Sequence, residues 1–301
     1  MALKDIKAKI GATKRMNTVT RAMEAVSAVK MRKTQGQAFA GRPYARAALA
    51  ILARLSGSGD MLRHPLAKVR EVKKLGLVVM TSDKGLAGAL NSGVIKRATE
   101  AVASYKPEEV TVFAYGKKGE EYFARRGYTV AKAFENKRDD VPISIMEELS
   151  RELSEGFLAG SYDEVFVVYS NFKSTFEQLP TGRTLLPLSI ERVAELVADI
   201  RPVKGKWADE VAIDAPASYE VESTEDILGL LIPRLVAVSL YHLLLESKAS
   251  EHSARMVAMK SASDKSKEVV RDLTRLYNKI RQAAITREVS EIVGGREALA
   301  T

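Results

Sequence analysis

The sequence contains no cysteine. Disulfides, thiolate metal sites and thiol catalysis are therefore excluded, and the composition suits a reducing compartment. Its three histidines, His64, His242 and His252, have neither metal-ligand spacing nor a paired carboxylate motif, so we expect ordinary surface or interface roles for them. The sequence also lacks the P-loop, nucleophile-elbow, dinucleotide-fingerprint and His-Glu-x-x-His motifs. These absences predict a chain that is not an enzyme and that binds no cofactor or metal of its own.

Long apolar runs and a leader-like N-terminus are also missing. The first nine residues carry four charges and no apolar stretch, which is not typical of a signal peptide. No stretch reaches the roughly 18–20 uncharged apolar residues that a membrane-spanning helix needs. The nearest, Ile227–Leu245, is interrupted by Pro233, Arg234 and His242. We therefore expect no membrane span.

Both ends of the chain are long helical patterns. The stretch 247–293 contains no proline, no glycine and a single aromatic residue, Tyr277. Its apolar positions recur at spacings of four, three, four and three, namely Val269, Leu273, Leu276, Ile280 and Ala283. The N-terminal run has Leu3, Ile6, Ile10 and Thr13, and then less regularly Met16, Thr20 and Met23. Heptad spacing favours a narrow helix–helix seam, so the sequence predicts a long antiparallel coiled coil of the two ends.

Positive charge is concentrated in the N-terminal helix. Residues 1–33 hold nine Lys and Arg against Asp5 and Glu24, a net +7 of the chain's +9. A basic helix favours an acidic partner, either nucleic acid or an acidic protein surface. The same segment has no aromatic side chain on which bases could stack, which disfavours a binder of single-stranded nucleic acid. A solvated basic face remains the alternative.

Between the helical ends, the hydrophobic period changes. Short apolar runs at 74–80, 110–115, 128–134 and 164–169 are typical of buried parallel strands. Helical patterns separate them, at 92–105, 117–126 and 143–158. This alternation predicts a doubly wound α/β sheet. The expected divisions are an N-terminal coiled-coil helix (1–58), an α/β domain (70–200), an irregular foot segment (201–222) and a C-terminal coiled-coil helix (223–301).

Two prolines bear on the long helices. The first helix is expected to run from Leu3 to about Leu55, with a bend or interruption at Pro43. Pro233 should kink the last helix without ending it, because the apolar pattern continues through Leu235 and Val238.

The segment 81–91 is the one candidate for a nucleotide site. It follows a predicted strand and opens a predicted helix, which is where α/β sheets bind phosphates. Gly85 and Gly88 alone are a weak signal, and Lys84 precedes the glycines instead of following them. A tight turn with an outward contact surface is therefore favoured over a nucleotide site.

At this point several motifs carry a resemblance to a known family. They are Thr20–Glu24, Lys30–Lys33, Arg42–Tyr44, Ser82–Asn91, Lys248–Lys260, Tyr277–Glu288 and Glu291–Gly295. In order and spacing the chain resembles the gamma subunits of F-type ATP synthases from end to end. It differs from some relatives by having Ala87 and Ala89 in the segment 81–91. It also lacks the cysteine-containing regulatory insertion of chloroplast relatives, so thiol switching is not expected.

The resemblance implies a fold and a role. The fold is a long antiparallel coiled coil of N- and C-terminal helices plus a central Rossmann-like α/β domain. The role is that of the central stalk rotor, which couples ion-driven c-ring rotation to conformational change at beta-subunit catalytic sites and has no active site of its own. The implied partners are the alpha and beta subunits of the catalytic head, the epsilon subunit and the membrane c-ring, with no nucleic acid. The implied location is the cytoplasmic face of the bacterial plasma membrane.

The resemblance also implies contact residues. Those facing beta subunits are Met23, Lys84, Gly85, Asn91, Arg281, Gln282, Thr286, Arg287 and Glu288. Those at the foot, facing the c-ring and epsilon, are Arg42, Tyr44, Lys204 and Trp207. Two alternatives remain from other classes, a coiled-coil nucleic-acid-binding protein and a nucleotide-binding α/β enzyme. Both leave the paired terminal heptads unexplained.

Overall fold

The computed structural model describes residues 3–40, 64–137, 141–189, 192 and 224–300. Its helices are α1 (Leu3–Ala40), α4 (Leu90–Ala101), α5 (Lys117–Ala124), α6 (Ile143–Leu158) and α8 (Thr224–Ala300), with short 3-10 helices η2 (Pro65–Ala67) and η3 (Pro107–Glu109). Its strands are β1 (Leu75–Met80), β2 (Val110–Tyr115), β3 (Thr129–Phe134), β4 (Glu164–Phe172) and β5 (Gln178–Leu186). The four predicted strands and the three helices between them are confirmed.

The strands form one five-stranded sheet in the order β3-β2-β1-β4-β5. β1 pairs in parallel with β2 and β4, and β2 pairs in parallel with β3. β5 runs antiparallel to β4. The sequence patterns did not predict β5, since it contains Pro180 and Gly182, which are unfavourable in a central strand. Its position at one edge of the sheet makes that composition tolerable.

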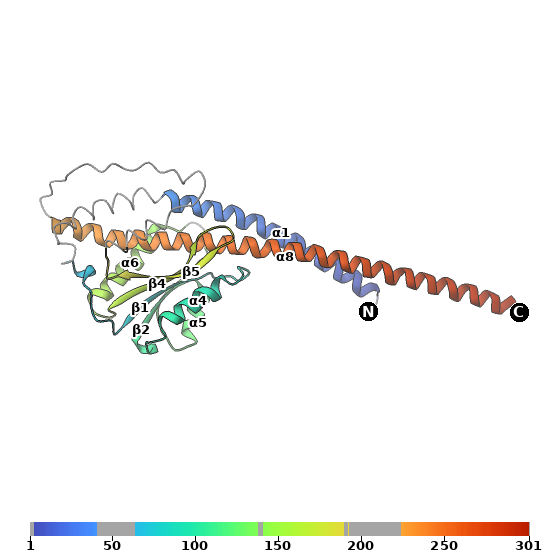
Figure 1. Cartoon of the computed structure of the whole chain (residues 1–301), viewed down its shortest axis with the longest axis horizontal. Helices are drawn as coiled ribbons and strands as arrows, with labels where there is room; N and C mark the ends of the chain where they lie inside the picture. The colour runs from blue at the N-terminus through green and yellow to red at the C-terminus, as the bar shows by residue number, and fades with distance from the viewer. Residues whose placement is uncertain (1–2, 41–63, 138–140, 190–191, 193–223, 301) are drawn as a thin grey trace. The chain divides into compact units, whose positions relative to one another are not determined.

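The sheet is covered on both faces, as a doubly wound fold requires. On one face, β1 and β2 pack against α4 and α5 through Val79, Val112, Val94 and Phe123. On the other face, alternate strand residues such as Val78 and Val167 pack against α6 and the first turns of α8. Figure 1 shows α8 passing along this second face beside α6.

The N-terminal part of α8 is a core helix of the sheet domain. A window of α8, within Leu228–Val293, has a mean hydropathy of 1.8 and is long and apolar enough to cross a membrane, but 56% of it is buried inside the protein. Its buried residues against the sheet include Leu228, Ile232, Leu235, Leu240, Leu243 and Leu244. Core packing therefore accounts for this hydrophobicity. α8 continues through Pro233, as expected.

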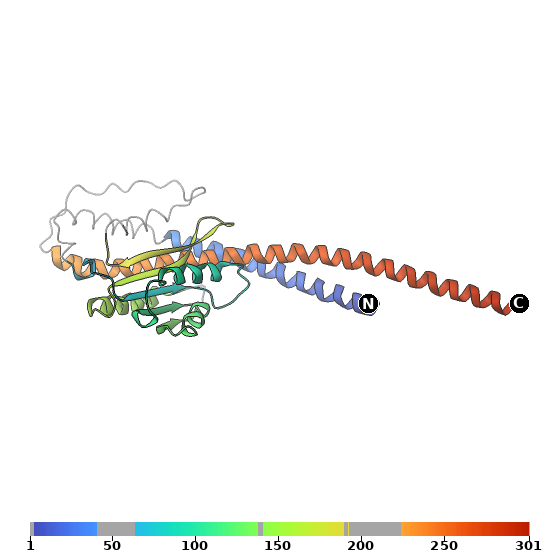
Figure 2. The same cartoon turned by 60° about the horizontal axis from the view of Figure 1, so that its bottom comes forward.

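The chain separates into two compact units, Ala28–Arg255 and a pairing of Met1–Ser27 with Met256–Thr301. The first contains the sheet. In the second, which we call the helical pair, α1 and α8 lie antiparallel and side by side (Figures 1 and 2). The predicted coiled coil of the two chain ends is confirmed for these residues.

The seam of the helical pair differs from the predicted one at three positions. Met16 is 59% exposed, and Leu276 is 42% exposed. Ala283 is exposed as well. Asn17 and Tyr277 take the adjacent, partly buried places. At Met16 the prediction was wrong because it followed the apolar residues, whereas the seam takes the polar Asn17. With Asn17 opposite Ser263, Ala283 lies past the level of Leu3, where α1 no longer faces α8.

Small hydroxyl side chains fill the middle of this seam. Thr20, Ser263 and Ser266 are buried there. Thr20 Oγ1 donates to the carbonyl O of Met16 (3.1 Å) and Ser266 Oγ to that of Ala262 (2.7 Å), so both hydroxyls are satisfied within their own helices. Asn17 Nδ2 donates across the pair to the carbonyl O (2.6 Å) and Oγ (3.1 Å) of Ser263. This cross-helix bond sets the register of the two helices.

That register determines how far α8 extends. With Asn17 opposite Ser263 and a rise of about 1.5 Å per residue in both helices, Leu3 lies opposite about residue 277. The remaining C-terminal turns of α8 therefore continue beyond Leu3 as a single helix.

Candidate functional site

The predicted contact loop lies at the carboxyl edge of the parallel strands. It joins β1 to α4, and we call residues 82–91 the collar loop. Ser82 and Asn91 close it at its base: Asn91 Oδ1 accepts from Ser82 N (3.0 Å), and Asn91 Nδ2 donates to Ser82 Oγ (2.7 Å). Ser82 Oγ also donates to the carbonyl O of Lys84 (2.6 Å). The partly buried Asn91 side chain therefore holds the base of the loop closed, while Lys84 and Gly85 are exposed.

The tip of the collar loop is conformationally strained. Leu86 has φ = 65°, in the left-handed region that favours glycine, and is 61% exposed. Such a conformation costs about 1–3 kcal/mol and persists only where the surroundings hold it. The hydrogen bonds of Ser82 to Asn91 Oδ1 and to the carbonyl O of Lys84 hold the loop in this conformation. The outcome is an ordered loop that presents Lys84, Gly85 and Leu86 to the outside.

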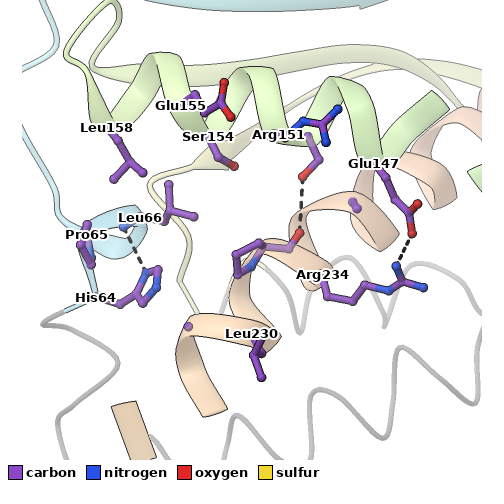
Figure 3. Close-up of a pocket in the computed structure, with 14 residues that line it drawn as sticks. His64, Pro65, Leu66, Glu147, Arg151, Ser154, Glu155, Leu158, Leu230 and Arg234 are labelled. Carbon is purple, nitrogen blue, oxygen red and sulfur yellow. Dashed lines mark hydrogen bonds and ion pairs between the residues drawn. The ribbon is translucent and has the colours of Figure 1, made fainter. Parts of the chain in front are cut away.

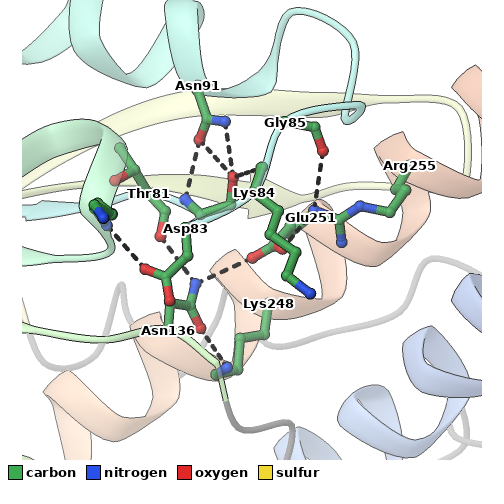
Figure 4. A network of polar contacts seen from close by, with 11 residues as sticks. Thr81, Asp83, Lys84, Gly85, Asn91, Asn136, Lys248, Glu251 and Arg255 are labelled. Carbon is green, nitrogen blue, oxygen red and sulfur yellow. Dashed lines mark hydrogen bonds and ion pairs between the residues drawn. The ribbon is translucent and has the colours of Figure 1, made fainter.

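A network of buried polar groups lies between the collar loop and α8 (Figure 4). Asn136 Nδ2 donates to the carbonyl O of Thr81 (2.9 Å) and to Glu251 Oε2 (3.0 Å), and Asn136 Oδ1 accepts from Lys248 Nζ. Glu251 Oε1 pairs with Arg255 (2.7 Å), whose guanidinium also reaches the carbonyl O of Gly85 (3.5 Å). The network therefore ties both the start and the tip of the loop to α8.

The charges in this network are deeply buried. Lys248 is only 2% exposed and Glu251 only 7%. Burial raises the pKa of the Glu251 carboxyl, against the opposing effect of the nearby Arg255 and Lys248 cations. Buried charges that lose a partner are costly, so this cluster holds a single arrangement of the loop. Lys248 and Glu251 belong to a sequence motif that predicted no role for them, and Asn136 was not predicted at all. No sequence spacing links Asn136 to α8, because only the fold brings them together.

A tight turn fixes the neighbouring β2–α5 connection. Gly116 has φ = 100°, and a Cβ atom there would lie 2.0 Å from the carbonyl O of Thr81. Only glycine fits. Lys117 N next to it donates to Asp83 Oδ1 (2.9 Å), which fixes the second residue of the collar loop.

The geometry favours a contact surface over a phosphate site in this loop. Ser82 N–H donates to Asn91 and so is not available to an anion. The carboxylates of Asp83, within the loop, and of Glu251, beside it on α8, would repel a phosphate group (Figure 4).

A separate pocket of about 590 Å³ lies between α6, η2 and the start of α8 (Figure 3). Two of its polar contacts are the pair of Arg234 with Glu147 and the bond that His64 Nδ1 accepts from Leu66 N (3.2 Å). Ser154 Oγ in the same lining is buried and has no hydrogen-bond partner among the described residues. Burial lowers the pKa of His64. Among the described residues, no group of three or more His, Cys, Asp or Glu side chains could hold a metal ion. Among the described residues that line the pocket, Ser150 Oγ donates to the carbonyl O of Pro233 (3.4 Å), and neither serine hydroxyl bonds to a histidine or a carboxylate.

The remaining predicted beta-subunit contacts lie in the helical pair. Met23 is half-buried on α1, and Arg281, Gln282, Thr286, Arg287 and Glu288 are exposed on the single-helix end of α8. By the register, Met23 lies opposite about residue 257, roughly 36 Å along the pair from Arg281. The two groups of residues therefore lie at separate levels of the helical pair. The foot residues Arg42, Tyr44, Lys204 and Trp207 lie outside the described residues, as does the foot segment 201–222.

Comparison with known proteins gives a consistent result. A family model described as ATP synthase matches residues 2–299. The ATP synthase gamma chain of Roseiflexus castenholzii is 41% identical over 302 residues, covering 99% of this chain and 98% of the relative. That of Pelotomaculum thermopropionicum is 36% identical over 298 residues, covering 99% of each.

Solved structures share the fold. A chain of the Euglena gracilis mitochondrial ATP synthase (OSCP/F1/c-ring) aligns with a TM-score of 0.63 at 17% identity, over 99% of this chain and 94% of that one. A chain of the Tetrahymena thermophila central stalk/c-ring aligns with a TM-score of 0.58 at 23% identity, over 81% of this chain and 99% of that one. Sequence identity, coverage and fold together show that this chain belongs to the ATP synthase gamma-chain family.

Proposed function

We propose that this chain couples ion-driven rotation of a membrane c-ring to conformational change at the catalytic sites of beta subunits. It is the shaft of the machine and has no active site of its own. Membership of the gamma-chain family supports this role. The observation that carries it is the helical pair, which buries a narrow seam and leaves its other sides open to partners.

The mechanism requires a shaft that is different on each side. A rotor changes a binding site only if it interacts unequally with the conformations of that site. Each 1.4 kcal/mol of such difference changes nucleotide affinity about tenfold. The exposed end of α8 offers unlike faces, because apolar Ile285 and Val289, four residues apart, lie on one face and charged Arg287 lies on the opposite one.

Weak contacts suit this task. The net +7 on residues 1–33 favours acidic segments on the beta subunits. Exposed ion pairs contribute only about 0–1 kcal/mol each, so many of them can form and break during a turn. A single tight ion pair would oppose each step by the energy it had supplied.

The proposed partners follow from the same role. Alpha and beta subunits surround the helical pair, and the collar loop meets a beta subunit through Lys84 and Gly85. The foot, with Arg42, Tyr44, Lys204 and Trp207, meets the c-ring and the epsilon subunit. The proposed location is the cytoplasmic face of the bacterial plasma membrane, as a peripheral part of the complex.

A double substitution tests the coupling role. Arg281→Ala with Gln282→Ala removes two exposed polar side chains from α8, so the assembled complex should pump fewer protons for each ATP that it hydrolyses. The matched control is Arg275→Ala with Asn278→Ala, also exposed on α8, which should retain more of the coupling. A double variant that couples like the parent complex contradicts the role of Arg281 and Gln282.

A second experiment tests the absence of catalysis. The purified polypeptide should hydrolyse no ATP on its own. ATPase activity that scales with its concentration and survives further purification would contradict the proposal.

A further inference from the structure

Several hydrogen bonds close the hairpin between β4 and β5. Its tip, residues 173–177, is closed by Lys173 N and Ser174 N, which donate to the carbonyl O of Glu177 (3.2 and 3.0 Å). Gln178 Nε2 donates back to the carbonyl O atoms of Ser174 (3.1 Å) and Thr175 (2.9 Å). These bonds fix the tip internally.

α8 anchors the same tip. Ser253, which is fully buried, donates from Oγ to the carbonyl O of Thr175 (2.7 Å). Arg255, two residues further along α8, reaches the collar loop at Gly85. One turn of α8 therefore holds both loops.

The hairpin and the collar loop also meet at their bases. The carboxyl ends of β1 and β4 point to the same edge, because these strands pair in parallel. A Cβ atom on Gly93, just after the collar loop, would lie 2.8 Å from Pro180 Cγ on β5. The two loops are thus parts of one surface.

This surface carries three exposed apolar side chains. Phe176 at the hairpin tip is 80% exposed, and Leu179 and the collar residue Leu86 are exposed as well. Because the tip is already ordered, it loses little conformational entropy when it binds. An exposed aromatic side chain on such a tip is suited to fill an apolar recess. Lys173 and Glu177 carry opposite charges, so the tip adds no net charge. Lys84 supplies the exposed cation on the adjoining loop.

We propose that the β4–β5 hairpin is a second contact with the beta subunit that the collar loop reaches, with Phe176 inserted into an apolar recess of that subunit. This inference rests on the proposed function. The collar loop provides the cationic half of the contact and the hairpin provides the apolar half. Together they make a two-point contact on one rigid edge of the sheet domain.

The cysteine-free sequence allows a direct test. Phe176→Cys places the only thiol of this chain at the hairpin tip, where a photoactivatable maleimide can label it in the assembled complex. Gly85→Cys reports the collar contact, and a Cβ atom there meets nothing within 4 Å. Val69→Cys is the matched control, because Val69 is also an exposed apolar residue (79%). It precedes the amino end of β1, whereas the collar loop follows the carboxyl end of that strand.

The expected result is a beta-subunit adduct from positions 176 and 85 and little from position 69. A beta adduct from position 85 without one from 176, or a 176 adduct only with another subunit, overturns the inference and leaves the proposed function standing. Equal adduct yields at 176 and 69 also overturn it. No adduct at either 85 or 176 contradicts the proposed collar contact itself.

A functional readout complements the crosslinking. Phe176→Ser should lower the number of protons pumped for each ATP hydrolysed, whereas Val69→Ser should not. Because both side chains are exposed, the melting temperatures of both variants should match that of the parent chain. A Phe176→Ser complex that couples like the Val69→Ser complex overturns the inference.

Discussion

The two units of this chain solve the packing problem in opposite ways. The sheet domain buries large apolar side chains on both faces of a sheet, among them Val78, Phe123 and Phe157. The helical pair buries Ile6 and Met259 together with small hydroxyl residues such as Ser263. One unit is stabilised by the volume of its core and the other by the fit of a narrow seam. The sheet domain therefore has a large core that fixes the positions of its loops. The helical pair buries only a seam and leaves most of its side chains exposed.

The largest expected effect is on the stability of the sheet domain. Phe157→Ala removes a fully buried ring from the sheet domain and should lower the free energy of unfolding by about 3–5 kcal/mol. Leu158→Ala, at the next and more exposed position, is the control. Urea unfolding followed by tyrosine fluorescence measures both. Equal losses from the two variants would contradict the view that core volume stabilises this unit.

The seam should respond to added volume instead. Ser263→Leu overfills it, which costs about 1–3 kcal/mol, and disturbs the bond from Asn17, worth about 1 kcal/mol more. Ser261→Leu adds the same volume at an exposed position of α8. Thermal unfolding followed by circular dichroism should show a lower transition only for Ser263→Leu. If the larger side chain is tolerated or stabilises the pair, the seam does not depend on small residues.

The link between the loop and α8 gives a third test. Asn136→Ala removes the amide that joins Thr81, Lys248 and Glu251, with an expected cost of about 1–3 kcal/mol. Faster amide hydrogen exchange in residues 82–91, with unchanged exchange in β2, is the expected signature. Asn278→Ala, on the exposed face of α8, is the control. Unchanged exchange in the collar loop would show that the network does not hold it.

The smallest expected effect is on the stability of the sheet domain at acid pH. Burial would raise the pKa of Asp163, but hydrogen bonds from Lys73 N and Lys74 N, together with the positive charges of Arg70 and Lys74, outweigh it and hold the pKa below its usual value. The folded state therefore gains stability above the unfolded-state pKa of about 3.9, and loses that gain as pH falls through the folded-state pKa.

Asp163→Asn should remove that pH-dependent gain. The stability difference between parent and variant should be present at neutral pH and vanish in acid, as measured by unfolding across a pH series. Glu108→Gln neutralises an exposed carboxylate of the same domain as the control. A difference that grows as pH falls would contradict the sign.

The sequence predicted the parts of this structure that depend on local pattern. The alternating apolar runs identified β1 to β4, and the heptads identified the antiparallel pairing of the chain ends. β5 was missed, because Pro180 is tolerated there only through its place at the sheet edge. Met16 was placed on the seam and Asn17 was not, because the polar contact of Asn17 depends on the partner helix.

The candidate site was predictable only in its outer residues. Lys84 and Gly85 belong to a recognisable motif, and both are exposed on the collar loop. The groups that hold the loop come from β1, the segment after β3 and α8, which are distant in sequence. The hairpin tip at Phe176 carries no sequence motif, since its order comes from hydrogen bonds within the hairpin and from Ser253 on α8.

The central claim is that the two ends of the chain form one shaft that turns within the assembled enzyme. Ala12→Cys and Glu268→Cys place two spin labels on exposed sides of α1 and α8, at the same level by the observed register. Double electron–electron resonance should give a short, narrow distance distribution, consistent with helix axes about 8–10 Å apart. A long or broad distribution in the assembled enzyme would contradict the shaft.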